Sequence, residues 1–362
     1  MKHIAISCGG TGGHLAPGIA VAQEFVRRGY RVNLFISQKN VDTRLAMDYG
    51  ELQFITLAGS GFSLRPISLF KFLFNLIKAF GKFWRFTGKN RVDALIAFGG
   101  FSSIGTALVS FFHRKPIFLH EANLQLGKAI RCLAPLAQKV YIPNALKETK
   151  RFRKKQKFIS MGYPIRRDFH PIPMEDARRA ISLPLHGKCV LICGGSQGAK
   201  PLNDWVKAHE FTLTFMGYHV ICLTGLGGED REITCAHGEN FSHVVRYCAF
   251  HSHMHWLYSA ADFAISRAGA GTIAELIQCE TPSVLIPYPF STANHQWKNA
   301  KAMADGGMAF LLEQENMEKL LPLIRRWNEG TLQSMRRNLH HKKQMESDVT
   351  KILVDDITSH LE

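Results

Sequence analysis

Two short apolar strands, each followed by a glycine-rich loop and a helix, constrain the fold of this chain most strongly. Residues 3–8 run into G-G-T-G-G-H at 9–14, and in the second half of the chain residues 189–193 run into G-G-S-Q-G at 194–198. A helical stretch and a second strand follow in each copy, and such units build parallel sheets with right-handed crossovers. The duplication therefore predicts an α/β fold of two doubly wound, Rossmann-like domains that face each other across a cleft.

The domain boundary and the remaining strands follow from the same alternation. Gly162-Tyr163-Pro164, after the basic run 147–157, predicts a seam between a first domain at 1–163 and a second at 164–340. Apolar residues at helical spacing in 348–361 predict a C-terminal helix, at about 341–362, that joins the first domain. The other expected strands are 31–36, 93–98, 116–120, 218–223, 261–266 and 283–287.

Composition narrows the class of protein. The 362 residues include 45 Lys plus Arg against 29 Asp plus Glu, a net charge of +16, and 46% are hydrophobic, which excludes a disordered chain and a disulfide mini-protein. No apolar run reaches the roughly 18 to 20 residues that span a bilayer, and no signal peptide is evident. The eight cysteines lack C-x-x-C spacing, so we expect reduced thiols in a cytosolic protein. Nucleic acid, acidic lipid and a phosphorylated substrate are candidate partners for the excess positive charge.

The glycine loops favour an anionic ligand. Backbone N–H groups in such a loop, and the helix N-terminus behind it, attract phosphate, and Gly99–Gly100 forms a third glycine pair at a strand end. Pro201 stands where a P-loop needs Ser or Thr, and Ser37 and Thr224 stand where a dinucleotide fold needs an acid, which disfavours a kinase or an NAD enzyme. The alternative is that the glycines only form tight turns.

The stretch 266–275 is more specific. A strand ends at Ser266, small residues form a turn, and a helix is expected to begin near Gly271, which places open N–H groups and the Thr272 hydroxyl at a phosphate. Glu275 lies one turn further, where its carboxylate can accept hydrogen bonds from both hydroxyls of a ribose. The alternative is that Glu275 only complements the helix dipole.

Six motifs in this order resemble the MurG family of peptidoglycan glycosyltransferases. They are G-G-T-G-G-H (9–14), H-E-x-N (120–123), G-Y-P-I-R (162–166), G-G-S-Q-G-A (194–199), S-R-x-G-x-x-T-x-x-E (266–275) and N-H-Q-x-x-N-A (294–300). The resemblance implies the GT-B fold and transfer of N-acetylglucosamine from UDP-N-acetylglucosamine to polyprenyl-pyrophosphoryl-MurNAc-pentapeptide, lipid I, in cell-wall synthesis. It also implies a peripheral position on the cytoplasmic face of the bacterial plasma membrane, beside other cell-wall synthesis proteins.

The resemblance further implies a set of site residues. Glu275 would bind the ribose, Gln296 the sugar hydroxyls, and the backbone at His251 the uracil edge. The implied donor-binding residues are Arg166, Ser196, His251, Ala270, Gly271, Thr272, Ile273, Ala274, Glu275 and Gln296. Those that would reach the transferred sugar from the other side are Thr11, Gly12, Gly13 and Asn123, and Gly99 with Gly100 would hold the acceptor pyrophosphate.

The implied reaction is an inverting displacement at the anomeric carbon, and it needs a base. His14 has a suitable unperturbed pKa of ~6.5, although it could instead rigidify its loop, and Glu121 is the second candidate. The chain contains no D-x-D motif, so we expect no metal and no other cofactor. The run H-x-H-x-H at 251–255 could bind zinc only with a fourth ligand, and none is evident.

A basic amphipathic helix is expected within residues 52–92, which contain no acid. An apolar side of Leu, Ile, Phe and Trp opposite a basic side is typical of a helix in a membrane interface. The expected membrane face consists of Leu73, Ile77, Phe80 and Trp84, with Lys78, Lys82 and Arg85 toward anionic lipid headgroups. The alternative is an ordinary amphipathic helix packed on the sheet.

Two residues differ from the family pattern, and two other classes of protein are alternatives to this family. Ala122 and Ile130 stand where the family pattern has Gln and Asn, near the acceptor or sugar end. Another GT-B enzyme, such as a UDP-N-acetylglucosamine epimerase, is one rival, and the first glycine loop and the basic helix argue against it. A nucleic-acid-binding protein is the other, and no RNA or DNA module is recognisable, so we expect no nucleic-acid partner.

Overall fold

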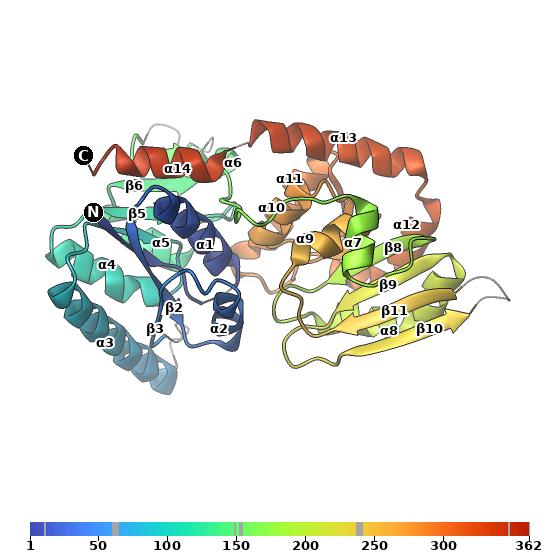
Figure 1. Cartoon of the computed structure of the whole chain (residues 1–362), viewed down its shortest axis with the longest axis horizontal. Coiled ribbons are helices and arrows are strands. Elements are labelled where there is room, and N and C mark those ends of the chain that lie inside the picture. Colours follow the sequence, from blue (N-terminus) through green and yellow to red (C-terminus); the bar gives the residue numbers. More distant parts are fainter. Residues whose placement is uncertain are drawn as a thin grey trace. The chain divides into compact units, whose positions relative to one another are not determined.

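The structure is a computed structural model that describes residues 1–10, 12–59, 65–147, 150–151, 155–236, 242–346 and 348–361. It forms two compact units, Met1–Arg167 together with Asp348–Glu362, and Asp168–Ser347 (Figure 1). The division after Arg167 falls slightly later than the expected seam at 163.

Unit 1 contains a parallel sheet in the order β3-β2-β1-β4-β5-β6-β7. Its strands are β1 (His3–Ser7), β2 (Arg31–Ser37), β3 (Phe54–Leu57), β4 (Ala94–Ala97), β5 (Ile117–His120), β6 (Lys139–Ile142) and β7 (Phe158–Ser160). Its helices are α1 (Gly12–Arg27), α2 (Asn40–Met47), α3 (Pro66–Lys89), α4 (Ser102–Phe112), α5 (Lys128–Leu133), the 3-10 helix η1 (Ala134–Leu136), α6 (Asn144–Lys147) and α14 (Val349–Thr358). Side chains alternate across the sheet, so Ile4 and Ile6 enter one core and Ala5 the other.

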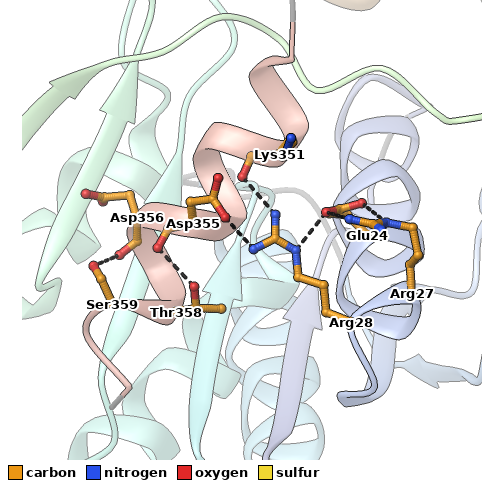
Figure 2. A network of polar contacts seen from close by, with 8 residues as sticks. All are labelled: Glu24, Arg27, Arg28, Lys351, Asp355, Asp356, Thr358 and Ser359. Carbon is orange, nitrogen blue, oxygen red and sulfur yellow. Dashed lines mark hydrogen bonds and ion pairs between the residues drawn. The ribbon is translucent and has the colours of Figure 1, made fainter.

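Helix α14 completes unit 1. Leu353 and Ile357 are fully buried in the core that contains Ile4. Arg28, directly after α1, donates to the Asp355 carboxylate at 2.5 Å and to the Lys351 carbonyl at 3.3 Å (Figure 2). A hydrophobic contact with a charged rim therefore fixes the C-terminal helix on α1.

The expected C-terminal helix at 341–362 was wrong in its start. Residues 341–345 belong to α13 (Glu329–Met345) in unit 2, and α14 begins only at Val349. Asp348 between them has a φ of 60°, a left-handed conformation that a continuous helix excludes. The apolar spacing identified α14 correctly but gave no sign of this break.

Unit 2 contains a sheet in the order β10-β11-β9-β8-β12-β13-β14, parallel except for the β10–β11 pair. Its strands are β8 (Lys188–Cys193), β9 (Tyr218–Leu223), β10 (Arg231–Ala236), β11 (Ser242–Cys248), β12 (Phe263–Ser266), β13 (Ser283–Leu285) and β14 (Ala309–Leu311). Its helices are α7 (Met174–Ala180), α8 (Lys200–Phe215), α9 (Met254–Ala260), α10 (Ala270–Gln278), η2 (Thr292–Asn294), α11 (His295–Asp305), η3 (Gln314–Lys319), α12 (Leu320–Arg326) and α13.

Both sheets reverse their strand order at the equivalent point of their topology. In unit 1 the chain runs outward from β1 through β2 on one side and β4 on the other, and in unit 2 β8 lies between β9 and β12. Ligands of open α/β sheets bind outside the carboxyl ends of the strands at such a point. The loops after β1 and β4, and those after β8 and β12, are therefore the places to examine.

Candidate active site

The glycine loops of unit 1 pack against one another with no space for side chains. A Cβ on Gly9 would lie 2.2 Å from the backbone nitrogen of Ser37, and one on Gly100 would lie 2.5 Å from the carbonyl oxygen of Gly9. Gly100 also has a φ of 76°, which glycine adopts without strain. The structure thus brings Gly99–Gly100 beside the first loop, as the predicted site requires. Thr11 lies outside the described residues.

His14 lies in the first turn of α1, against the Gly99–Gly100 pair. A Cβ on Gly99 would lie 3.2 Å from Nε2 of His14. Burial lowers the pKa of His14, and the nearby carboxylates of Glu121 and Asp42 oppose that shift. An imidazole that is neutral near pH 7 has a lone pair available to accept a proton.

Glu121 has a different environment. Its Oε1 accepts hydrogen bonds from the backbone and side-chain nitrogens of Asn123, both at 3.0 Å, and its Oε2 accepts one from Gly127 N–H at 2.7 Å. The buried carboxylate thus organises the loop 121–127 and orients Asn123. Of the two candidate bases, the geometry favours His14.

His120 is the neighbour of both groups. Its Nε2 lies 3.1 Å from the Gly162 carbonyl, to which it can only donate. Burial lowers its pKa to about 4, so this imidazole is neutral at physiological pH. It therefore acts as a fixed donor that ties β5 to the chain after β7.

In unit 2 the second glycine loop is equally tight. A Cβ on Gly198, whose φ is 72°, would lie 2.0 Å from the Thr224 carbonyl oxygen. Ser196 lies in this loop, and its carbonyl accepts from Leu226 N–H at 3.4 Å. Helix α8 begins directly afterwards, so its N-terminus lies at the carboxyl edge of the sheet.

Helix α10 begins at Ala270, after Gly269 as the N-cap. The first N–H groups of a helix have no intrahelical acceptor, and here no capping side chain satisfies them, so Ala270, Gly271 and Thr272 present donors to a ligand. Glu275, one turn on, is half-buried, and Tyr258 donates to its Oε2 at 3.4 Å. Burial raises the pKa of Tyr258 well above its usual value, so it stays a donor. Ile273 and Ala274 lie on the same turn.

Arg267 holds the loops around α10 together, a role that the sequence analysis missed. Its buried guanidinium donates to the carbonyls of Ile286 and Pro287, both at 3.1 Å, and to Gln314 Oε1 at 2.6 Å. The motif contained this arginine, but its three acceptors lie on segments that only the fold brings near. Arg267 therefore holds the segments around the start of α10 in place.

Gln296 lies in the first turn of α11. Its Oε1 accepts from Tyr288 N–H at 2.9 Å, and its amide nitrogen has two further donors suited to hydroxyl groups. Asn299, on the same helix, donates to the Ala268 carbonyl at 3.1 Å. Helix α11 is thus fixed to the turn that precedes α10.

His251 and Arg166 have other surroundings. Burial lowers the pKa of His251, and its Nδ1 is buried without a hydrogen-bond partner in the described part of the chain. Arg166 is buried within unit 1, where it donates to the Tyr49 hydroxyl at 2.8 Å. Its expected contact with the nucleotide stays a prediction. Within the described ranges no group of three or more His, Cys, Asp and Glu could hold a metal ion.

Of the apolar residues expected on the membrane face of α3, Leu73, Ile77 and Trp84 are exposed and Phe80 is not. Phe83 packs inside unit 1 against Phe35, with ring centroids 4.8 Å apart, and Phe80 is half-buried. Because phenylalanine recurs on more than one side of this helix, its buried side could not be identified from spacing alone. The exposed apolar residues on α3 and the adjoining end of α4 are Ile67, Phe70, Leu73, Phe74, Ile77, Trp84, Phe111 and Phe112.

The basic residues of α3 border this exposed apolar band. The ammonium group of Lys78 lies 4.3 Å from the centre of the Phe74 ring, and Lys82 donates to the Thr56 carbonyl at 2.7 Å. Arg85 is exposed. Among the described residues, no helix has the length and apolar character needed to cross a membrane.

Comparison with known families agrees with this arrangement. Residues 4–142 match the glycosyltransferase family 28 N-terminal domain, and residues 189–352 match the glycosyltransferase family 28 C-terminal domain. The crystal structure of Acinetobacter baumannii MurG superposes with a TM-score of 0.67 at 23% identity, over 99% of this chain and 100% of that chain. Fold and domain matches together define a GT-B glycosyltransferase of family 28.

Curated relatives narrow the class. A protein of Opitutus terrae named UDP-N-acetylglucosamine–N-acetylmuramyl-(pentapeptide) pyrophosphoryl-undecaprenol N-acetylglucosamine transferase is 36% identical, over 99% of this chain and 94% of its own length. A protein of Protochlamydia amoebophila with the same name is 31% identical, over 97% of this chain and 94% of its own. The chain belongs to this family of transferases, the MurG family.

Proposed function

We propose that this protein transfers N-acetylglucosamine from UDP-N-acetylglucosamine to the MurNAc hydroxyl of polyprenyl-pyrophosphoryl-MurNAc-pentapeptide, which converts lipid I to lipid II. The observation that carries the proposal is the match along nearly the whole chain to relatives named for this reaction. The residues at the carboxyl edges of both sheets support it, because unit 2 has helix N-termini suited to an anion there and burial lowers the pKa of His14 in unit 1.

Unit 2 would bind the donor. The N-termini of α8 and α10 and the loop at Ser196 would hold the diphosphate, and Glu275 would accept hydrogen bonds from the ribose hydroxyls. Gln296 would donate to the sugar, and the backbone at His251 would contact the uracil. Preorganised N–H groups stabilise the charge that develops on the leaving diphosphate, and each such donor contributes about 3 kcal/mol in comparable oxyanion sites.

Unit 1 would bind the acceptor and remove its proton. Gly99 and Gly100 would hold the acceptor pyrophosphate, while Gly12, Gly13 and Asn123 would contact the transferred sugar. His14 would take the proton as the acceptor oxygen attacks the anomeric carbon. Glu121 would then position Asn123 rather than act as the base.

The test is transfer of labelled N-acetylglucosamine from its UDP form to a short-chain polyprenyl acceptor, with and without EDTA. We expect transfer that EDTA does not abolish, and inhibition by EDTA would contradict metal-independent chemistry. His14→Ala should lower kcat by about 100-fold or more with unchanged donor affinity. Near-full turnover of this variant would exclude His14 as the base.

A matched pair of variants tests the donor site. Glu275→Gln should raise the KM for UDP-N-acetylglucosamine about tenfold, because hydrogen bonds to a charged group contribute roughly 1.5–3 kcal/mol. Glu318→Gln, at an exposed glutamate of η3, should leave it unchanged. Equal effects of both changes would contradict the assignment of Glu275.

The exposed apolar band of α3 and α4 supports a peripheral position on the cytoplasmic face of the plasma membrane. Exposed Phe, Leu, Ile and Trp side chains beside Lys and Arg suit an interface that contains anionic lipid. Each Lys or Arg near such a surface contributes about 1 kcal/mol. A polyprenyl-linked acceptor would give this contact its purpose.

A further inference from the structure

A buried carboxylate lies directly behind the first glycine loop. Asp42, on α2, is fully buried, and its Oδ2 accepts hydrogen bonds from Gly10 N–H at 2.7 Å and from the Ser37 hydroxyl at 2.6 Å. Ser37 N–H adds a longer contact at 3.3 Å. Asp42 thus connects the loop after β1 to the end of β2.

The carbonyl of the same glycine is held as well. Lys39 is exposed, and its ammonium group donates to the Gly10 carbonyl at 2.8 Å. The N–H of Gly10 is therefore fixed by an anion and its carbonyl by a cation. Four residues further along the chain this loop becomes the first turn of α1, which carries His14.

The charge of Asp42 is incompletely compensated. Its second oxygen, Oδ1, is buried and has no hydrogen-bond partner in the described part of the chain. A buried anion with an unpaired oxygen projects a stronger field than a solvated one, because the surrounding protein screens it less than water does.

Several charged or titratable groups face His14. Asp42 and Glu121 favour its protonated form, whereas Lys39 and burial oppose it. His120 also lies within electrostatic range, and burial keeps it neutral by lowering its pKa to about 4. Glu121 already accepts three hydrogen bonds, two from Asn123 and one from Gly127. Glu121 is the stronger of the two carboxylate influences on His14, and Asp42, whose Oδ1 accepts no hydrogen bond in the described part of the chain, is the second anion able to stabilise a positive charge on the imidazole.

We propose that Asp42 is a positioning residue for the transfer reaction: it fixes the Gly10 peptide, and so the start of α1, and it stabilises the imidazolium that His14 becomes. This rests on the proposed function. In that reaction the acceptor hydroxyl gives its proton to His14, its oxygen forms a bond to the anomeric carbon, and the bond from that carbon to UDP breaks with its electron pair leaving on UDP. An anion near a base that acquires positive charge lowers the energy of that step.

The first measurement follows His14 directly and needs no turnover. NMR of the full chain with labelled histidine gives the His14 titration, assigned by the signal lost in His14→Gln. Asp42→Asn should move this titration to lower pH, since asparagine keeps an acceptor for Gly10 but carries no charge. Lys39→Met, at an exposed position, should move it to higher pH at low salt. A His14 titration that neither change moves would overturn the proposal.

The second measurement is the pH dependence of kcat/KM for transfer. Asp42→Asn should lower kcat about tenfold or more and shift the acidic limb to lower pH, whereas Asp42→Glu should restore part of both. Asp48→Asn, an exposed aspartate just after α2, should change neither. A loss of activity with an unmoved acidic limb would show a merely structural role and refute the proposal. If the two variants shift the His14 titration but the wild-type protein shows no transfer activity, the proposed function is refuted instead.

Discussion

The proposed membrane contact of α3 leads to a quantitative prediction. Phe70 and Ile77 are 73% and 70% exposed, so replacing both by glutamate removes apolar surface without opening the core of unit 1. Burying one such side chain stabilises by roughly 1.5–3 kcal/mol, so two contribute roughly 3–6 kcal/mol. Each ~1.4 kcal/mol corresponds to a tenfold change in affinity, and the Phe70→Glu/Ile77→Glu protein should bind anionic vesicles at least about 100-fold more weakly.

A matched control comes from unit 2. Phe211 and Phe215 on α8 are 66% and 81% exposed, so Phe211→Glu/Phe215→Glu introduces the same charge and removes a similar apolar area. Cosedimentation with vesicles containing anionic phospholipid should separate the two double variants, while turnover of a short-chain acceptor in solution should stay near wild type in both. Equal binding by the α3 variant and the wild type, or equal loss in both variants, would refute the assignment of this surface.

Three further predictions concern the loops and the stability of the fold. Gly100→Ala would place a Cβ 2.5 Å from a carbonyl oxygen of the first loop and should lower transfer about 100-fold, whereas Gly88→Ala, with open space around it, should not, as initial rates will show. Leu353→Ala, at a fully buried residue of α14, should lower the free energy of unfolding of unit 1 by about 3–5 kcal/mol in urea titrations, against a small effect of Ile352→Ala. Burial lowers the pKa of His219 to about 4, so between pH 6.5 and 4 the unfolded chain binds a proton that the folded chain does not, and stability falls as the pH falls. His219→Gln should reduce that loss, as denaturation midpoints at pH 7 and 5 will show, and an identical loss would contradict it.

Elements with a local signal could be predicted from the sequence. The strand at 218–223 was predicted with the bounds it has, and helix α10 begins one residue before the expected Gly271, because apolar runs and glycine turns are local features. The doubly wound architecture of each unit is confirmed for the same reason, since a repeated strand–loop–helix order leaves few topologies.

The residues that hold the loops could not be predicted in this way. Arg267 contacts the carbonyls of residues 286 and 287. Asp42, which follows β2, contacts Gly10, which follows the neighbouring strand β1. Neither pairing leaves a pattern in the sequence. The buried side of α3 was also beyond spacing arguments, because phenylalanine recurs all round that helix and only contact with the sheet selects Phe83. Side chains that act through partners distant in sequence become visible only once the fold is known.

In the proposed donor site, the position of Glu275 would let one helix end bind both an anion and a diol. A carboxylate in the first turn of α10 would repel a diphosphate bound at Ala270–Thr272. Five residues at ~1.5 Å each place the Glu275 backbone about 7.5 Å along the axis from Ala270. That separation approximates the step from a diphosphate to the ribose it is attached to, so the charge lies where hydroxyl donors are expected. The hydrogen bond from Tyr258 holds the carboxylate there, so the N-terminus of the helix would remain available to the phosphates of the proposed donor.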